Sequence, residues 1–325
     1  MKNVIFRIKG GFDSSSTGKG ILAADESLPT ITKRLESVGV DSTEGSRHSY
    51  RYNLFSTEGL ENYIGGVILF DETIRNEKTI QPLVDKGICL GIKVDKGAKP
   101  YDSNGLLTEG LDGLSCRLHE YKGLGAEFAK WRAVLNVEDS DACIIANAWT
   151  LARYAKKCQD QGIVPIVEPE GLMSGGHHIS VSLKFTEKVL HHVFDAAYYE
   201  GVELETMILK PNMILNGYDR SIKTSNYVAE LTTDCLKRTV PAAVPMIAFL
   251  SGGQPDGMAV KNLDVINNKF KKLPWYTTFS FGRELQTKSL ALWANGKLDK
   301  AKEALLLRSG ECCKATLGQL YDTHL

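Results

Sequence analysis

A lysine at the end of a short apolar run has the clearest chemical potential in this sequence. Residues 205–212 read ETMILKPN, so Lys210 closes a predicted buried strand and Pro211 ends it. A free lysine has a pKa of about 10.4, so only about one amine in 2500 is neutral at pH 7. Partial burial or a nearby cation lowers that pKa, and a neutral amine can form a Schiff base with a carbonyl. A lysine at a strand end is more often a solvated surface residue, so Lys210 alone does not identify a site.

Charged and hydroxyl side chains also follow other short apolar runs of the chain. The predicted strands are 20–24, 64–70, 89–94, 127–132, 163–167, a sixth that ends at Lys210, 244–250 and 276–280. The side chains at their ends are Asp25, Lys93, Lys130, Arg132, Glu168, Glu170, Lys210, Ser251 and Arg283. Each one alone fits a solvated charge or a surface ion pair. Together they favour a site, because a cluster of buried like charges is costly without a ligand.

The elements that would position these residues alternate along the chain. Helical periodicity predicts helices over 141–157 and 186–200, between predicted strands. Eight strand–helix units in 325 residues predict a single-domain (β/α)₈ TIM barrel over 1–325. An N-terminal extension of about 1–17 and a C-terminal helical segment of about 298–325 would flank the barrel. The alternative is an open doubly wound sheet, but no GxGxxG follows the first strand.

The composition limits the classes of partner. The sequence has 39 basic and 39 acidic residues, and this balance argues against a nucleic-acid or membrane-surface protein. No segment approaches 18 consecutive apolar residues, which predicts a chain that neither spans a membrane nor is secreted. Seven cysteines without CxxC spacing indicate reduced thiols and a cytoplasmic protein.

Seven motifs of this sequence resemble class I fructose-1,6-bisphosphate aldolases. In order along the chain, from about residue 18 to about residue 295, the match includes GKGILAADES (18–27), IGGVILF (64–70), GIKVDKG (91–97), FAKWR (128–132), VPIVEPE (164–170), LKPNM (209–213) and FLSGGQ (249–254). The resemblance implies a TIM barrel and the cleavage of fructose 1,6-bisphosphate into triose phosphates. It also implies a reaction through a lysine Schiff base, without a metal or another cofactor.

The same resemblance implies roles for five catalytic residues. Lys210 resembles the Schiff-base lysine, and Lys130 would be a second cation that helps to keep its amine neutral. Glu168 resembles the acid/base residue that expels water from the carbinolamine, and Glu170 would adjust its pKa through like-charge repulsion. Asp25 resembles the carboxylate that contacts the C4 hydroxyl and assists its deprotonation as the C3–C4 bond breaks.

Two groups of residues are expected to hold the two phosphates. By resemblance, the C1 phosphate lies against glycines and a cation after the last two strands, at Ser251, Gly252, Gly253, Gly282 and Arg283. The C6 phosphate is expected at Ser27, Thr30, Arg34 and Lys93. Arg132 completes the predicted substrate-binding set.

Three segments differ from the pattern of the family. Leu28-Pro29 replaces a Thr-Gly pair beside the expected C6 site, and Pro255-Asp256-Gly257 replaces acidic residues after Gln254. Family members usually end in a flexible tail that closes with a tyrosine. Tyr321 is expected to belong to the last helical segment instead, so the role of that tyrosine is not assigned to it.

Three other functions are alternatives to this interpretation of the sequence. A metal-dependent aldolase needs convergent histidines, whereas His177-His178 and His191-His192 are adjacent pairs that face different ways. A Schiff-base aldolase for deoxyribose phosphate or tagatose bisphosphate would not share all the motifs. A scaffold for actin or another acidic partner is a third class, as an added role. The family also implies a homo-oligomer, commonly a tetramer, with a dimer as the alternative.

Overall fold

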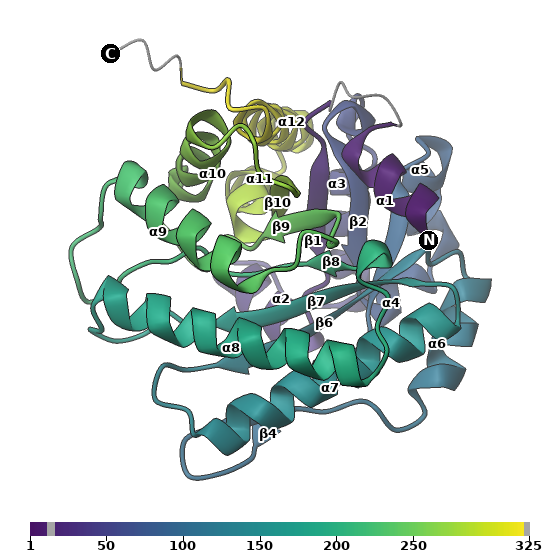
Figure 1. Ribbon diagram of the computed structural model, residues 1–325. Helices are drawn as coiled ribbons and strands as arrows, with labels where there is room; N and C mark the ends of the chain where they lie inside the picture. Colours follow the sequence, from purple (N-terminus) through teal and green to yellow (C-terminus); the bar gives the residue numbers. More distant parts are fainter. Residues whose placement is uncertain (12–16, 322–325) are drawn as a thin grey trace.

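Eight parallel strands form a closed barrel in the computed structural model, which describes residues 1–11 and 17–321 (Figure 1). Around the barrel the strands follow one another in the order β1, β10, β9, β8, β7, β6, β3 and β2. Closure comes from β1, where Ile21 lies opposite Ser280 of β10 and Gly66 of β2. The predicted TIM barrel is confirmed, and the open sheet is excluded. The barrel strands are β1 (Gly20–Ala24), β2 (Ile64–Leu69), β3 (Cys89–Lys93), β6 (Phe128–Leu135), β7 (Val164–Gly171), β8 (Ile208–Leu209), β9 (Met246–Phe249) and β10 (Tyr276–Phe281).

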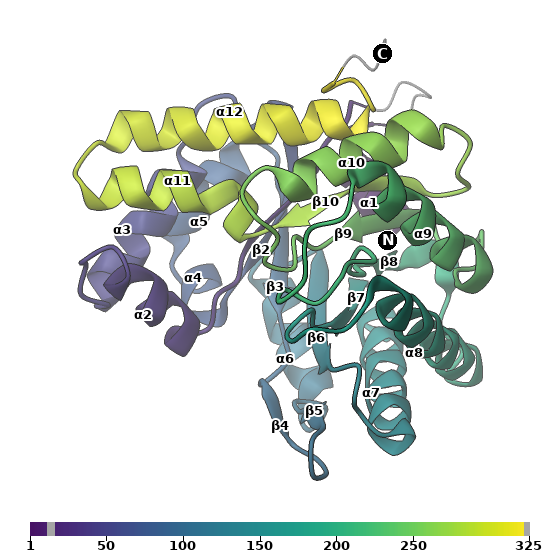
Figure 2. The ribbon, with the colours of Figure 1, turned by 90° about the vertical axis from the view of Figure 1, so that its left-hand side faces the viewer.

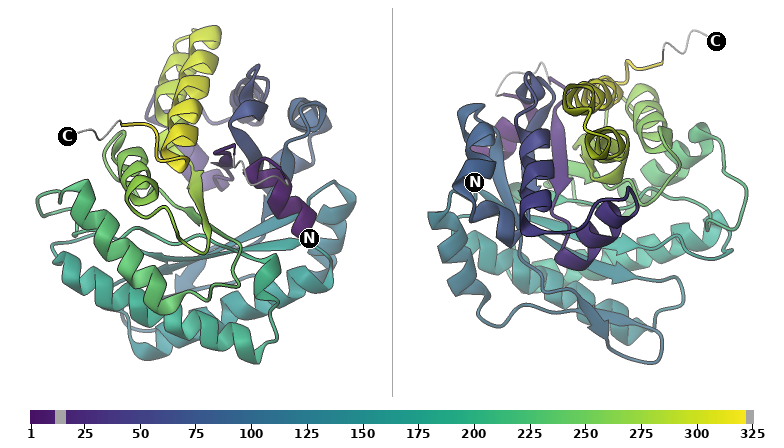
Figure 3. Two further views of the ribbon diagram at one scale, coloured as in Figure 1. Left: turned by 45° about the horizontal axis from the view of Figure 1, so that its top comes forward. Right: turned by 180° about the vertical axis from the view of Figure 1, so that it is seen from behind.

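Helices surround the strands (Figures 1 and 3), and α11 and α12 lie side by side as a pair (Figure 2). The helices are α1 (Lys2–Lys9), α2 (Leu28–Glu36), α3 (Glu44–Phe55), α4 (Asp71–Ile74), α5 (Glu77–Asp85), α6 (Leu114–Gly123), α7 (Asp141–Asp160), α8 (Ile179–Tyr199), α9 (Ser225–Thr239), α10 (Met258–Lys269), α11 (Arg283–Ala294) and α12 (Leu298–Thr316), with 3₁₀ turns η1 (Leu60–Asn62) and η2 (Leu204–Thr206). In the described part of the chain, no helix is long and apolar enough to cross a membrane.

Several element boundaries differ from the prediction. Helix α8 begins before the predicted 186–200, because the His178 side chain accepts a hydrogen bond from the Ser180 amide and caps the helix. Strand β7 continues to Gly171, beyond the predicted 163–167. A hairpin of β4 (Ala98–Pro100) and β5 (Leu106–Thr108), between β3 and α6, was not predicted.

Helix α1 packs against the barrel, so this part of the predicted N-terminal extension belongs to the core. Ile5 and Ile8 are buried in one cluster with barrel residues that include Ile21 and Phe128. A side chain at Gly65 would clash with α1, because its Cβ would lie 1.9 Å from the carbonyl oxygen of Ile8. The glycine pair in β2 therefore allows the close approach of α1.

The C-terminal helical segment begins at residue 298 as predicted, but α12 ends at Thr316. The expectation that Tyr321 belongs to this helix is therefore wrong. Gly318 has a φ of +65°, a left-handed conformation that follows the helix end. The segment is then held on α10, where Asp264 accepts a 2.9 Å hydrogen bond from the Leu320 amide. The last four residues of the predicted segment, 322–325, lie outside the described residues.

Candidate active site

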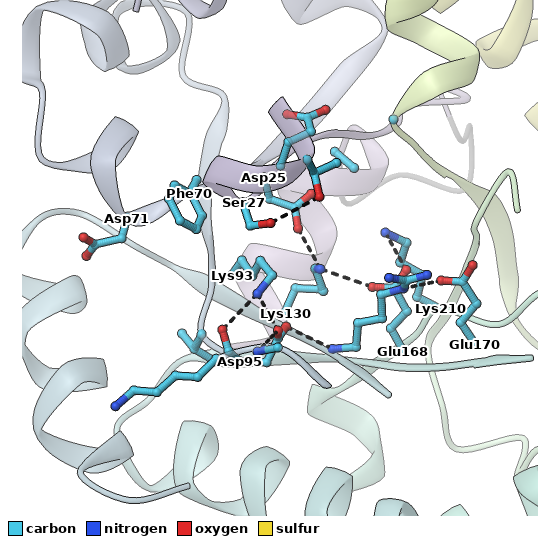
Figure 4. Close-up of a pocket in the computed structure, with 18 of the residues that line it drawn as sticks. Asp25, Ser27, Phe70, Asp71, Lys93, Asp95, Lys130, Glu168, Glu170 and Lys210 are labelled. Carbon is cyan, nitrogen blue, oxygen red and sulfur yellow. Dashed lines mark hydrogen bonds and ion pairs between the residues drawn. The ribbon is translucent and has the colours of Figure 1, made fainter. Parts of the chain in front are cut away.

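The predicted site residues gather around one cavity of about 980 Å³ at the C-terminal ends of the strands. All of them except Gly253 line this cavity. Figure 4 draws 18 of the lining residues and labels ten of them; Asp25, Lys130, Glu168 and Lys210 point toward one another from different strand ends. The barrel thus brings together residues that are spread from Asp25 to Arg283 in the sequence.

Four charged side chains form a continuous chain of ion pairs in the centre of the cavity (Figure 4). Nζ of Lys130 lies 2.6 Å from Oδ2 of Asp25 and 3.4 Å from Oε2 of Glu168. The other oxygen of Glu168, Oε1, lies 3.1 Å from Nζ of Lys210. Positive and negative groups therefore alternate from Asp25 to Lys210.

Each member of this chain comes from a different strand. Asp25 follows β1, Lys130 is the third residue of β6, Glu168 lies within β7, and Lys210 immediately follows β8. The side chains of Lys130, Glu168 and Lys210 are between 4% and 5% exposed. Desolvating so many charges costs several kcal/mol for each ion. Their mutual pairing offsets part of that cost, and the network opens onto a cavity that can receive a polar ligand.

The charges in the network determine the protonation states of Asp25 and Lys130. Burial alone would raise the pKa of Asp25, but the cationic side chains of Lys130, Lys210 and Lys93 lower it to about 2. Burial alone would lower the pKa of Lys130, but the carboxylates of Asp25 and Glu168 raise it well above its usual range. Asp25 is therefore an anion and Lys130 a cation near neutral pH.

Glu170 is paired with the predicted substrate-binding residue Arg132, on the neighbouring strand. The guanidinium Nε of Arg132 donates to Oε2 of Glu170. Because β7 continues to Gly171, Glu168 and Glu170 are two residues apart on one strand and share a face. The pair places a guanidinium at the wall of the cavity beside Glu168.

The residues predicted for the C1 phosphate meet at the ends of β9 and β10. Gly252 and Gly253 have φ values of +58° and +77°, which are left-handed conformations that favour glycine. Gly282 and Arg283 form the start of α11, and the backbone amides at a helix N-terminus can donate to an anion. A Cβ on Gly253 would lie 2.9 Å from Nη2 of Arg283, so the guanidinium lies directly over this turn. We call Ser251, Gly252, Gly253, Gly282 and Arg283 the C1 cradle.

The residues predicted for the C6 phosphate also line the cavity, but their cations already have carboxylate partners. Nη1 of Arg34 lies 2.5 Å from Oε1 of Glu26, and Nζ of Lys93 contacts Oδ1 of Asp95. Oγ of Ser27 lies 3.2 Å from Oγ1 of Thr30 at the start of α2. A phosphate at this position would therefore compete with two carboxylates for its cations. We call Ser27, Thr30, Arg34 and Lys93 the C6 group.

Sequence reasoning missed Asp95, which organises one wall of the cavity. Its side chain is 3% exposed and accepts from Nζ of Lys93, from the Arg132 amide at 3.3 Å and from the Gly97 amide at 3.2 Å. Asp95 lies two residues after Lys93 in GIKVDKG, so an acidic residue close to a predicted phosphate-binding lysine was the available signal.

A second missed group lies behind Asp25. The fully buried Arg51 donates to the Glu26 carbonyl at 2.9 Å and lies 3.3 Å from Oε2 of Glu72. Gln286 donates to the Ala23 carbonyl at 2.7 Å. These contacts fix the loop that carries Asp25, but Arg51 and Gln286 come from α3 and α11, and no local pattern marks them.

The histidine pairs do not converge. His178 caps α8, and His191 and His192 lie within it. Across residues 1–11 and 17–321, no group of three or more His, Cys, Asp or Glu side chains is arranged to hold a metal ion.

Comparisons with known proteins point to one family. The model of a family described as fructose-bisphosphate aldolase class-I matches residues 13–324. "Probable fructose-bisphosphate aldolase class 1" of Xylella fastidiosa is 48% identical over 318 residues, which are 94% of this chain and 95% of that protein. "Fructose-bisphosphate aldolase 6, cytosolic" of Arabidopsis thaliana is 46% identical, covering 93% of this chain and 87% of its own. A Plasmodium falciparum fructose-bisphosphate aldolase, solved with TRAP and a small-molecule inhibitor, superposes with a TM-score of 0.94 at 42% identity, covering 98% of this chain and 94% of its own.

Proposed function

Because this chain belongs to the class I fructose-bisphosphate aldolase family, it catalyses the reversible cleavage of fructose 1,6-bisphosphate in glycolysis, and we propose that Lys210 is the residue that forms the Schiff base. One observation carries this assignment. Lys210 is a buried amine at a strand end, 3.1 Å from the carboxylate of Glu168, and it faces the cavity. The Schiff base itself is the electron sink that this reaction needs, so no further cofactor enters the proposal.

In the first half of the proposed reaction, Lys210 passes a proton to Glu168 across their 3.1 Å contact, and the neutral amine then attacks the C2 carbonyl and forms a carbinolamine. Glu168 gives a proton to the C2 hydroxyl, water leaves, and a protonated imine remains on Lys210. Lys130 contacts Glu168 from the other side, so its charge stabilises the carboxylate form that the proton transfer leaves behind. Glu170 and Arg132 pair with each other in the adjacent wall of the cavity.

Asp25 is proposed to act in the second half. Its carboxylate takes the proton of the C4 hydroxyl while the C3–C4 bond breaks. The bonding electrons move into the protonated imine, and an enamine of dihydroxyacetone phosphate and free glyceraldehyde 3-phosphate result. Protonation of the enamine at C3 and hydrolysis of the imine then release dihydroxyacetone phosphate and return Lys210 to its free form.

We further propose that the C1 cradle and the C6 group hold the two phosphates separately. We expect Arg283→Met to raise KM by roughly 10- to 100-fold for both fructose 1,6-bisphosphate and fructose 1-phosphate. The substitution removes a charge-assisted hydrogen bond to the C1 phosphate, which both substrates carry. Arg34→Met should raise KM for the bisphosphate alone, since fructose 1-phosphate carries no C6 phosphate. Steady-state kinetics with both substrates measure the difference.

Arg153→Met is the matched control for these two variants, because Arg153 is a surface residue of α7 outside the cavity. It should leave both KM values unchanged. An equal rise for both substrates in Arg34→Met would contradict the division into two phosphate sites.

Other roles rest on the relatives rather than on the site. The Arabidopsis relative is described as cytosolic, which supports a cytoplasmic location for this chain. The Plasmodium falciparum relative was solved with TRAP, so a second role as an adaptor for a partner such as actin is an alternative. A homo-oligomer, as a tetramer or a dimer, is a further proposal. A Schiff-base aldolase for another phosphorylated sugar is the alternative within the same chemistry.

Borohydride trapping tests the main assignment. The protein is incubated with fructose 1,6-bisphosphate, reduced with borohydride with and without EDTA, digested and mapped by mass spectrometry. We expect a reduced adduct on the peptide that contains Lys210, at the same yield with EDTA. An adduct on another lysine would refute the assignment, and loss of activity with EDTA would favour a metal-dependent reaction.

A further inference from the structure

Two loops that follow neighbouring strands of the barrel are joined to each other by backbone hydrogen bonds. One follows β7 over residues 172–178, and the other follows β8 over residues 213–224. The amides of Gly217, Tyr218 and Asp219 donate to the carbonyls of His177, Met173 and Gly175, at 2.9, 2.8 and 3.1 Å. The loops that follow Glu170 and Lys210 therefore form one unit, which we call the paired loops.

The two residues before Tyr218 fix the shape of this unit. Oδ1 of Asn216 accepts from the Ile179 amide at 2.8 Å, and its Nδ2 donates to the Ser221 carbonyl at 2.8 Å. Gly217 has no room for a side chain, because a Cβ would lie 2.2 Å from the Gly175 carbonyl oxygen. The backbone of Tyr218 is consequently held in one position rather than left to move with a free loop.

The phenol of Tyr218 reaches from this unit to the C1 cradle. A Cβ placed on Gly253 would lie 3.0 Å from Oη of Tyr218 and 2.9 Å from Nη2 of Arg283. The hydroxyl and the guanidinium therefore meet over the same left-handed turn. Burial raises the pKa of Tyr218 despite the nearby charge of Arg283, so the hydroxyl keeps its proton and can donate it.

We propose that Tyr218 is a further substrate-binding residue, whose hydroxyl donates a hydrogen bond to the phosphate in the C1 cradle beside Arg283. This inference rests on the proposed cradle and extends it to a third strand end. The strand is β8, which also leads to Lys210, so one loop connects the nucleophile with the phosphate. The phosphate would be bound on one side by the backbone of Ser251–Gly253 and the start of α11, and on the other by Arg283 and Tyr218.

Tyr218→Phe tests the proposal, because it removes the hydroxyl and keeps the ring and the loop. We expect KM to rise about tenfold for both fructose 1,6-bisphosphate and fructose 1-phosphate, as for the loss of a hydrogen bond to a charged group. Because the bond is made before and during the reaction, kcat should change less than about twofold. Inorganic phosphate, used as a competitive inhibitor, should bind about tenfold more weakly.

Tyr199→Phe is the matched control. Tyr199 is 74% exposed at the end of α8, where its ring stacks on Trp149. This variant should match the wild type in KM and in inhibition by phosphate.

The outcomes separate this proposal from the proposed function. Tyr218→Phe could keep the wild-type KM and phosphate inhibition while Arg283→Met raises KM and weakens the inhibition. In that case Tyr218 does not bind phosphate, and the proposed C1 cradle stands. If neither variant changes them, the cradle itself is wrong. Borohydride labelling of Lys210 in Tyr218→Phe reports separately on the Schiff base, and its loss would show a damaged site rather than a missing contact.

Discussion

Lys210→Met is expected to abolish borohydride trapping and to lower kcat for fructose 1,6-bisphosphate by roughly four to six orders of magnitude, as the loss of a covalent nucleophile does elsewhere. Methionine has a similar length and no amine, so it fills the same space and cannot form an imine. Without the imine, the electrons of the C3–C4 bond would have to enter a ketone. Glu168 keeps a cationic neighbour in this variant, because Lys130 lies 3.4 Å from its other oxygen.

Retention of the fold must be shown for this variant. Circular dichroism and thermal unfolding should match the wild type, since the charge of Glu168 stays paired. Lys156→Met is the matched control, because Lys156 lies on the surface of α7 and pairs with Asp160. It should keep full activity and a normal adduct. A folded Lys210→Met protein that still forms an adduct would place the Schiff base on another lysine.

Asp25→Asn should separate cleavage from Schiff-base formation. We expect kcat for cleavage to fall by about 10²- to 10⁴-fold, the usual contribution of a general base. The adduct between Lys210 and dihydroxyacetone phosphate should still form, because that compound needs no C4 deprotonation. Single-turnover cleavage and borohydride trapping, carried out on the same preparation, measure the two steps. Equal losses in both would show that Asp25 acts on the whole site through Lys130.

The pH dependence gives a second test of Asp25. Its pKa is lowered to about 2 in the free protein, so it stays ionised at any pH at which the enzyme is assayed. Any acid limb of kcat/KM above pH 4 must therefore come from another group, and it should persist in Asp25→Asn. Asp141→Asn, at an exposed residue paired with Lys188, is the control and should keep the wild-type rate. Disappearance of the acid limb in Asp25→Asn would contradict the assigned protonation state.

The sequence predicted the barrel because each apolar run ends in a polar residue and each strand is followed by a helical pattern. The strand ends at Asp25, Glu168 and Lys210 follow directly from that pattern, and the structure places them around one cavity. Prediction worked for these residues because strand direction alone decides where they lie. The resemblance, rather than the pattern, supplied their individual roles.

The remaining features depend on contacts between distant segments. Arg51 reaches the loop of Asp25 from α3, and Tyr218 reaches Gly253 through a loop whose shape depends on Met173 and Gly175. Tyr218 lies in a loop without periodicity, so nothing local marks it. The pairing of Lys93 with Asp95 also required coordinates, because an acidic residue two positions after Lys93 does not by itself show that the two side chains meet.

The pairing of β1 with β10 has a consequence for synthesis on the ribosome. In the parallel pairing of these strands Ile21 lies opposite Ser280. Strand β1 therefore cannot pair with β10 until most of the chain has been translated. Until then β1 and β9 each have one edge whose backbone N–H and C=O groups are unpaired. Such edges tend to pair with strands of other chains. Polypeptides released by premature termination before Tyr276 would lack β10, so the edges of β1 and β9 would stay unpaired. We expect chaperones and proteases to bind such polypeptides. The activity of this enzyme in a cell therefore depends on completing nearly the whole message, even though Lys210 is made much earlier.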